Sequence, residues 1–388
     1  MPESPSDPTS ETRTGGPAAL PLSGVTVLDL TRLPPGGFCT VLLADLGADV
    51  IRVESPKGRL FDGPVGLNRG KRSLALDLRH PRGLEVLRAL AAHADVLVEN
   101  ERPGVLAERG FGYEHAAAEA PRLVWCSITG YGQDGPYAQW SGHDLSFAAH
   151  SGLLTALHPD LPWHPELILP IPVGALMASV GILAALRERD RTGTGCQLDI
   201  SLSESASWLL SSADGIIDRG PRGVPSGPDR RVYECAADTW VAVTAAEPRT
   251  WAALCDGLGL PDLAGSLHRW EDPVAVAERL AERFRGRRAE EWVAELGPRG
   301  ASVVRVNRGP DLPRDPQVAA RGLLRKVGDL TVPRAPVRIR DDSGERPAGP
   351  TYAPPPVGEH TRAVLAEAGL SAAAIDELHD CGAVGRRA

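Results

Sequence analysis

A histidine followed directly by an aspartate, His143 and Asp144, ends the segment GYGQDGPYAQWSGHD. An imidazole ionises near neutral pH, which makes it a common general base for removing a proton from a weakly acidic group. A carboxylate close to such a ring can orient it and stabilise its protonated form. A single histidine is more often structural than catalytic, so the assignment of His143 as a base depends on its surroundings.

A second set of candidates is basic. Arg69, Lys71 and Arg72 lie in the segment NRGKR, just before a predicted strand. Arg102 and Pro103 follow another predicted strand. Arginine and lysine side chains held by backbone geometry bind phosphate groups, and open α/β sheets bind ligands at the ends of their strands. The two loops therefore predict contact with a phosphorylated ligand. For NRGKR alone, the alternative is a solvated run of surface charge.

The composition argues against several classes of function. The chain has 388 residues, of which 42% are hydrophobic and 24% charged, as is usual for a globular protein with room for two domains. The net charge of −8, with basic and acidic residues interspersed, argues against nucleic-acid binding. The most apolar segment, 173–186, is shorter than the roughly 18 residues of a membrane helix and runs into the charged residues 187–190. We expect no membrane span.

The cysteines and the short motifs exclude further chemistry. The six cysteines are widely scattered and form no CxxC pair, which predicts reduced thiols and a cytoplasmic location. No histidine, cysteine and carboxylate set has the spacing of metal ligands, so no metal site is expected. The sequence RLPPGGF follows the first predicted strand in place of GxGxxG, so a nicotinamide cofactor is unsupported.

Alternating short strands and helices must position these residues. Predicted strands cover 25–30, 49–54, 73–78, 95–100 and 123–130, and predicted helices cover 36–48 and 81–94. Strands separated by helices of this length form βαβ units, which predict an α/β fold with a parallel sheet and helices on both of its faces.

Changes in composition divide the chain. Residues 1–20 are polar and proline-rich and are predicted to be a disordered tail. The large α/β domain begins with 21–205, a linker containing glycine, proline and arginine covers 206–224, a smaller α+β domain covers 225–320, and 321–388 returns to the large domain.

Four longer segments carry a resemblance to a known family. They are NRGKRSLALDLRHPRGLEVLRALAAHADVLVENERPGV (68–105), ITGYGQDGPYAQWSGHDLSF (128–147), GILAALRERDRTGTGCQLDISLSES (181–205) and AAEPRTWAALCDGLGL (245–260). Together they resemble the family III CoA-transferases, over almost the whole chain. Gly142-His143-Asp144 and Ala246-Glu247-Pro248 are most similar to the α-methylacyl-CoA racemase branch.

The resemblance implies a substrate, a fold and roles for residues. The substrate is an acyl-CoA thioester, with CoA as part of the substrate and no separate cofactor. A Rossmann-like large domain binds CoA, and two chains thread through each other as an interlocked homodimer. His143 is a base for the α-proton, Glu247 of the smaller domain supports it from the other subunit, and Asp144 holds the loop. The residues beside the CoA moiety are Arg69, Lys71, Arg72, Leu74, Arg102 and Pro103.

The chain departs from the family at one catalytic position. Racemases use an aspartate as a second base and CoA-transferases use it as a nucleophile, about eleven residues before GILAAL. Pro170 stands there in this chain, and proline can neither accept a proton nor attack a thioester. The nearest acid is Glu166. The segment TAAEPRT also lacks the glycine-rich loop of the transferases.

Three functions therefore remain open from the sequence. The first is racemase-like α-proton chemistry on an acyl-CoA with His143 as the base. The second is a CoA-transferase with Glu166 as a non-standard nucleophile. The third is a catalytically silent protein that binds CoA or an acyl carrier.

Overall fold

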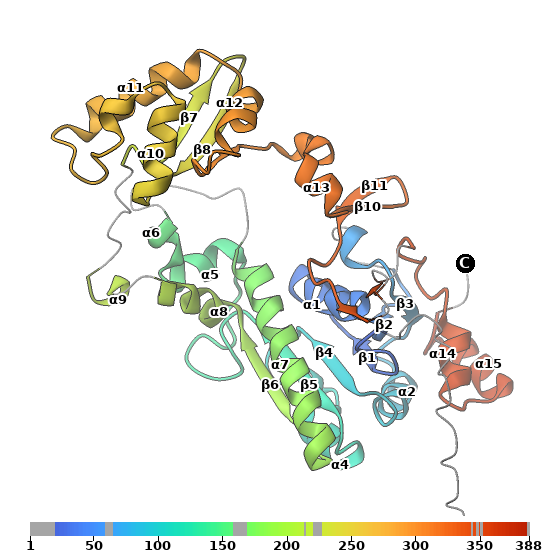
Figure 1. Ribbon diagram of the computed structural model, residues 1–388. Coiled ribbons are helices and arrows are strands. Elements are labelled where there is room, and N and C mark those ends of the chain that lie inside the picture. The colour runs from blue at the N-terminus through green and yellow to red at the C-terminus, as the bar shows by residue number, and fades with distance from the viewer. Residues whose placement is uncertain are drawn as a thin grey trace, which may run out of the picture. The chain divides into compact units, whose positions relative to one another are not determined.

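The computed structural model describes residues 20–58, 65–157, 169–212, 215–219, 227–342, 344–346, 349 and 352–385. The chain forms two compact units (Figure 1). The larger unit combines 1–217 with 323–388, and the smaller unit covers 218–322. Each unit is described by itself.

A six-stranded parallel sheet forms the centre of the larger unit. Its strands are β1 (Thr26–Asp29), β2 (Asp49–Glu54), β3 (Arg72–Ala75), β4 (Val96–Glu99), β5 (Val124–Thr129) and β6 (Gln197–Ser201). Their order, β3-β2-β1-β4-β5-β6, is that of a Rossmann sheet. The prediction of a Rossmann-like parallel sheet is confirmed, and β6 is a strand that the sequence analysis did not separate from its motif.

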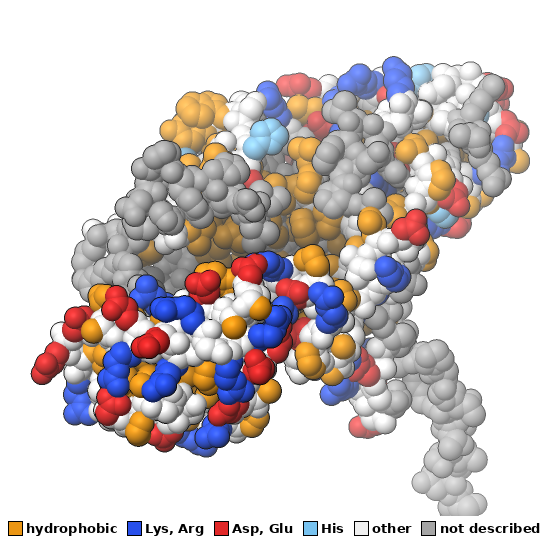
Figure 2. Space-filling view, turned by 90° about the horizontal axis from the view of Figure 1, so that it is seen from above, with side chains coloured by type: hydrophobic (Ala, Val, Ile, Leu, Met, Phe, Trp, Pro, Cys, Tyr) orange, Lys and Arg blue, Asp and Glu red, His pale blue; other side chains and the backbone are white. Residues whose placement is uncertain are grey.

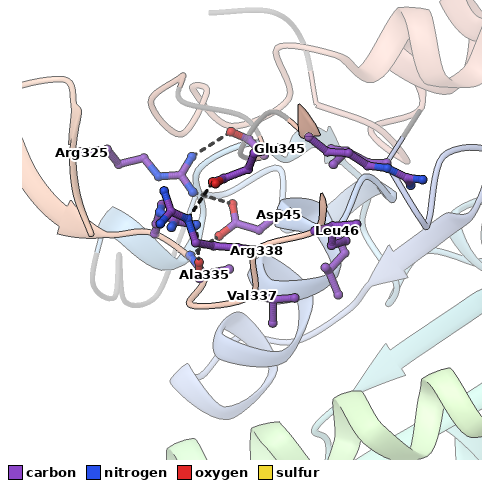
Figure 3. A pocket seen from close by; sticks show the side chains of 12 residues that line it. Asp45, Leu46, Arg325, Ala335, Val337, Arg338 and Glu345 are labelled. Carbon is purple, nitrogen blue, oxygen red and sulfur yellow. Dashed lines mark hydrogen bonds and ion pairs between the residues drawn. The ribbon is translucent and has the colours of Figure 1, made fainter. Parts of the chain in front are cut away.

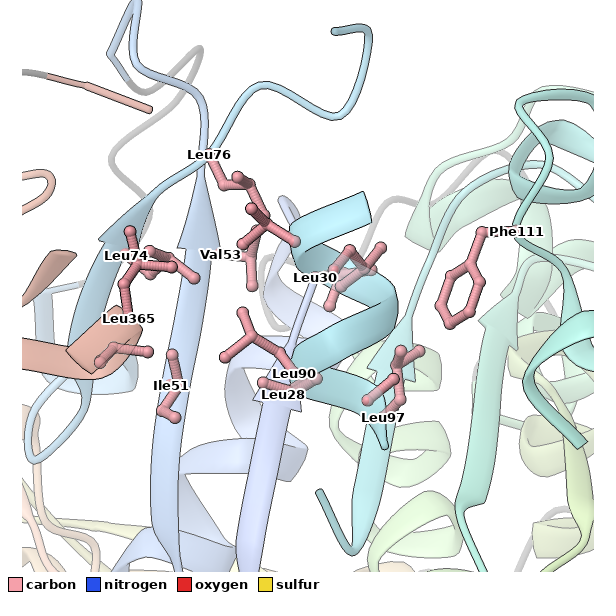
Figure 4. Packing of buried hydrophobic residues seen from close by; sticks show 14 of the residues in the cluster. Leu28, Leu30, Ile51, Val53, Leu74, Leu76, Leu90, Leu97, Phe111 and Leu365 are labelled. Carbon is pink, nitrogen blue, oxygen red and sulfur yellow. The ribbon is translucent and has the colours of Figure 1, made fainter. Parts of the chain in front are cut away.

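Helices cover both faces of this sheet. Successive side chains of a strand point to opposite faces, so Leu28 and Leu97 join one core with helices α2 (Pro81–Ala91), α14 (Thr361–Glu367) and α15 (Ala372–Asp380) (Figure 4). Val27 and Val96 join the opposite core with α1 (Pro34–Asp45) and α7 (Pro170–Thr192). A parallel sheet with two apolar faces requires this arrangement.

The larger unit contains further, short helices in its described part. They are η1 (Val65–Leu67), α3 (Val105–Glu108), α4 (Tyr113–Glu119), α5 (Asp144–His150), α6 (Leu153–Leu157), α8 (Leu202–Trp208), η2 (Leu209–Ser212) and α9 (Ile216–Arg219), the last at the boundary with the smaller unit. Within the described ranges, α7 is the one helix whose length and apolar composition would allow it to cross a membrane. Core helices of water-soluble proteins pass the same test, and one face of α7 packs in the apolar core beside the sheet.

Asp45, at the end of α1, connects the C-terminal part of the larger unit to its N-terminal part. This buried carboxylate pairs with Arg69. It also pairs with Arg325 and accepts the N–H of Ala335 at 3.1 Å (Figure 3). The segment carries two short hairpins, β10 (Leu324–Val327) with β11 (Leu330–Pro333) and β12 (Arg340–Asp341) with β13 (Gly344–Glu345). One carboxylate thus joins three parts of the chain that are far apart in sequence.

The smaller unit is an antiparallel sheet covered by helices, so the predicted α+β fold is confirmed. Its elements are β7 (Arg230–Cys235), β8 (Thr239–Thr244), β9 (Val303–Arg305), α10 (Pro248–Gly257), η3 (Pro261–Leu263), α11 (Pro273–Arg285), α12 (Ala289–Leu296), η4 (Gly309–Arg314) and α13 (Pro316–Ala320). The sequence analysis missed β9. Trp251 and Phe284 are fully buried in its core. Basic and acidic side chains are interspersed on the face that Figure 2 shows.

A buried ion pair stands at the centre of the large sheet. The Lys71 ammonium donates to Asp29 Oδ2 at 2.9 Å and to Thr40 Oγ1 at 2.6 Å, and the Lys71 side chain is only 1% exposed. Burial opposes ionisation of Asp29, but Lys71 and the hydroxyls of Thr31 and Thr40 hold the pKa of that carboxyl below its usual range. Together, these contacts connect β1, α1 and the start of β3.

Two residues that are predicted to lie beside the CoA moiety, Lys71 and Leu74, are buried in this structure. Lys71 is enclosed by protein oxygens, so its charge stabilises the fold in this structure and is not presented to a ligand phosphate. The Leu74 side chain is fully buried in the core shown in Figure 4. Neither burial was evident from the sequence, because a basic loop before a strand is usually exposed.

Replacing Lys71 with methionine is expected to lower the free energy of unfolding by about 3–5 kcal/mol, because Asp29 would keep a buried charge without its partner. The double variant Asp29→Asn, Lys71→Met removes both charges and should recover most of that loss. Urea unfolding followed by circular dichroism measures both variants. A Lys71→Met protein as stable as wild type, but weakened in CoA binding, would return Lys71 to the ligand site.

Candidate functional site

The sheet reverses its winding between β1 and β4, and the loops after these two strands lie together. The backbone N–H of Arg32 donates to Asn100 Oδ1 at 3.1 Å, and the Arg32 guanidinium lies 3.2 Å from Glu101 Oε1. In open α/β folds the crevice at this point, outside the carboxyl ends of the strands, is where ligands bind. The strand order therefore selects this edge as the candidate site.

His143 precedes the first residue of α5 and is exposed. Its backbone is extended, its carbonyl accepts the Ser146 N–H at 2.8 Å, and its own N–H donates to Ser146 Oγ at 3.4 Å. Gly142 is needed beside it, because a Cβ there would stand 2.6 Å from the Phe147 ring. The helix start thus fixes the backbone of His143 and leaves its imidazole accessible.

Asp144 connects the start of α5 to the start of α7. Its side-chain oxygens accept the N–H of Leu169 at 3.2 Å and the N–H of Ile171 at 3.0 Å. Burial raises the pKa of Asp144, and these two donors oppose the shift. Pro170, in the position where the aspartate is expected, is the buried first residue of α7. Asp144 is therefore positioned to hold the two helix starts together.

Arg102 and Pro103 lie against the segment that leads to His143. The exposed Arg102 guanidinium donates to Ser141 Oγ at 2.6 Å. The Pro103 carbonyl accepts from Gln139 Nε2 at 3.0 Å. The loop after β4 and the GHD segment thus form one continuous surface, on which a cation stands close to the candidate base.

The other two predicted phosphate-binding arginines are occupied by carboxylates. Arg69 is buried against Asp45 and the Gly66 carbonyl. Arg72 pairs with Asp49 and, at 2.7 Å, with Glu367, which connects β3 to β2 and to α14. In this structure both guanidinium groups serve the fold.

A cleft of about 330 Å³ at the carboxyl ends of β1, β2 and β3 offers other cations. Arg32, Lys57 and Arg79 line it, and all three side chains are exposed. They were not among the predicted phosphate-binding residues, because they come from three loops that are far apart in the sequence. The strand order is the signal that would have found them, since it brings the three loops to one edge of the sheet.

Glu247 lies in the smaller unit and has a local environment similar to that of His143. It precedes the first residue of α10, is exposed, and its N–H donates to Thr250 Oγ1 at 3.2 Å. A carboxylate at a helix N-terminus is favoured by the helix dipole. Glu247 thus belongs to the smaller unit and His143 to the larger one.

Two further expectations concern residues that the structure does not fully cover. Glu166, the alternative nucleophile, lies outside the described residues. In the part of the chain that is described, no three or more histidine, cysteine, aspartate and glutamate side chains gather in a way that would hold a metal ion.

Glu99, at the end of β4, is a buried carboxylate beneath the site. Its Oε2 accepts the N–H of Glu101 at 2.7 Å, just before Arg102. Burial raises the pKa of Glu99 to about 7, and hydrogen bonds from Ser127 and from the Glu101 N–H oppose this shift only in part. The loop that carries Arg102 is therefore anchored on a group that titrates near neutral pH.

This pKa predicts a pH-dependent stability. Between the usual value of 4.5 and about 7 the unfolded chain has released the Glu99 proton and the folded chain retains it, so wild type loses stability as the pH rises. Glu99→Gln has no such proton. Its free energy of unfolding, relative to wild type, should rise by about 3 kcal/mol between pH 4.5 and pH 8.

Urea unfolding across this pH range tests the prediction, with the exposed Glu119→Gln as the matched control. Subtracting the wild-type value at each pH removes the contribution of all other groups. Parallel pH trends for the two variants would contradict the assignment.

Comparisons with known proteins agree on one family. Residues 22–361 match CoA-transferase family III. The chain is 33% identical over 373 residues to the alpha-methylacyl-CoA racemase of Homo sapiens, covering 92% of this chain and 96% of that protein. It is also 33% identical over 399 residues to the succinyl-CoA:glutarate CoA-transferase of Homo sapiens, covering 94% and 90%.

A solved structure gives the same result. A CaiB/BaiF family protein from Brucella suis matches with a TM-score of 0.76 at 30% identity, covering 90% of this chain and 100% of that one. Its similarity extends through both units. The chain therefore belongs to CoA-transferase family III, the superfamily of enzymes that includes acyl-CoA racemases and CoA-transferases.

Proposed function

We propose that this enzyme removes and returns the proton on the carbon next to the carbonyl of an acyl-CoA, with His143 as a base. The observation that carries the proposal is the exposed imidazole at the start of α5, on a backbone fixed by Ser146 and next to the residue that ties α5 to α7. It lies on the surface that Arg102 shares with the GHD segment. The similarity to a racemase supports carbon-acid chemistry.

The exposed cations suit a CoA ligand. We propose that Arg32, Lys57 and Arg79 hold its phosphates in the cleft at the carboxyl ends of β1 to β3. Arginine and lysine are suited to diphosphate and 3′-phosphate groups, which carry several negative charges. Arg102 then lies on the way from this cleft to His143, which is the direction that the pantetheine arm takes in this proposal.

The chemical step is a proton transfer. The α C–H bond breaks, its electron pair moves into the thioester to form an enolate, and His143 holds the proton. A carboxylate close to the ring stabilises the imidazolium. We propose that Glu247 of a second subunit supplies that charge.

A homodimer is part of this proposal, and an apolar stripe on α7 supports it. Leu176, Val180 and Leu183 follow one another at helical spacing and are 53%, 63% and 37% exposed. Such a stripe is expected to be covered by another apolar surface. A second copy of the chain is the partner we propose, because it would also bring a smaller unit to each His143.

Deuterium uptake tests the chemistry. In heavy water, wild type is expected to exchange the α-proton of a 2-methylacyl-CoA and to interconvert its two configurations. His143→Gln should lower the rate of interconversion about 100-fold or more, because a positioned base contributes at least that much. Mass spectrometry measures the uptake and chiral chromatography measures the configuration.

The exposed His115→Gln on α4 is the control for loss of an imidazole. Transfer of CoA to added succinate or glutarate without deuterium uptake would contradict the proposal and favour the transferase, whose nucleophile hydroxylamine would trap. A fully active His143→Gln protein would exclude His143 as the base.

A charged substitution in the apolar stripe of α7 tests the homodimer. Val180→Glu should weaken self-association about 100-fold, which corresponds to about 2.7 kcal/mol for an unpaired charge in an apolar interface. It should also abolish activity, since Glu247 would no longer reach the partner's site. Sedimentation velocity measures association, with Glu188→Lys on another face of α7 as the control. A wild-type monomer with full activity would refute the dimer.

A further inference from the structure

The proposed chemistry lacks a second proton-transfer group. Inverting a carbon centre requires a proton to leave one face and another to arrive on the opposite face. Pro170 stands where the family resemblance expects the second group, and it is a buried helix residue without a titratable atom. A replacement must be accessible, able to carry a proton, and near His143.

His150, the last residue of α5, has these properties. Its side chain is exposed, and its Nδ1 lies 2.5 Å from the hydroxyl of the buried Ser203 on α8. The ring also contacts Tyr131 and Tyr137 edge to face, with centroids 5.3 Å and 5.4 Å apart. Three neighbours therefore fix the orientation of the ring.

The hydrogen bond to Ser203 leaves the other ring nitrogen available. Among the described residues, no hydrogen bond to His150 Nε2 is found. When one nitrogen of an imidazole is held by a structural partner, the direction of the other nitrogen is set. A ring with one nitrogen held by the protein and the other directed outward is suited to act as a positioned acid or base. A histidine with a packing role alone does not need this arrangement.

His143 directly precedes α5, and His150 is the last residue of that helix. The two positions are seven residues apart, which is almost two helical turns, or roughly 10 Å along the axis. Two nitrogens on opposite faces of one carbon stand about 6–7 Å apart, and side chains that lean toward each other can close the difference. Tyr131 connects the two positions, since its hydroxyl lies 3.1 Å from where a Cβ of Gly142 would stand and its ring contacts His150.

We propose that His150 is the second proton-transfer residue, in place of the missing aspartate. This inference rests on the proposed function. As His143 takes the α-proton and the enolate forms, the protonated His150 gives its Nε2 proton to the opposite face of the α-carbon. The new C–H bond restores the thioester in the inverted configuration. His143 and His150 then exchange protons with solvent, and the reverse reaction uses the same groups in exchanged roles.

Ser203 is a positioning residue in this scheme. Its hydroxyl contacts Nδ1 of His150 and not Nε2, the nitrogen that transfers the proton in this scheme. Loss of that hydroxyl leaves the imidazole present but less well oriented. Removing the Ser203 hydroxyl should therefore slow the reaction of the same substrate configuration that loss of His150 affects. The decrease in rate should be smaller.

The test uses each configuration of a 2-methylacyl-CoA separately in heavy water with the full-length enzyme. His150→Gln should lower interconversion about 100-fold or more, yet it should retain deuterium exchange with the one configuration whose proton His143 removes. His143→Gln should show the opposite preference. Ser203→Ala should slow the reaction about 10-fold, with the preference of His150→Gln. His115→Gln should react as wild type.

The outcomes separate this inference from the proposed function. A His150→Gln protein that interconverts both configurations at the wild-type rate overturns the role of His150 alone. Equal loss of exchange with both configurations, in a protein whose circular dichroism and thermal unfolding match wild type, also overturns it. Absence of exchange in wild type overturns the proposed function and, with it, this inference.

Discussion

The paired hydrogen bonds from Leu169 and Ile171 to the Asp144 carboxylate are the interaction on which the site depends. A helix start leaves backbone N–H groups without partners, and α7 begins with Pro170 and Pro172, which have none to offer. Asp144 accepts the N–H between these prolines and the one before them. The residue next to His143 is thereby tied to the longest helix of the core, and this fixes the place of the imidazole.

The order of the strands explains why this place matters. Because β1 and β4 are neighbours in the sheet, the loops that carry Arg32 and Arg102 meet at the edge where the winding reverses. The buried ion pair of Lys71 and Asp29 stabilises the sheet just below it. Buried and exposed cationic side chains thus have different roles. The inner cations hold strands and helices, and the exposed ones remain available to an anionic ligand.

The sequence predicted the architecture well because apolar runs of strand length, separated by helices, have few other stable arrangements. Motifs in the sequence predicted His143 and Arg102 as site residues, and the structure places both on exposed loops at one edge of the sheet. The sequence could not show that Lys71 and Leu74 are buried, since that depends on Asp29, Thr40 and helices that approach from distant parts of the chain. It could not single out His150 either, because Ser203 reaches it only through the packing of α8 against α5.

The central claim is that the imidazole at position 143 faces the carbon next to a bound thioester. A crystal structure with a non-reactive 2-methylacyl-CoA analogue, in which a methylene replaces the thioester carbonyl, tests it most directly. The account predicts an imidazole nitrogen within about 3.5 Å of the α-carbon, with the phosphates among Arg32, Lys57 and Arg79. An α-carbon remote from this ring, beside other polar groups, would contradict it.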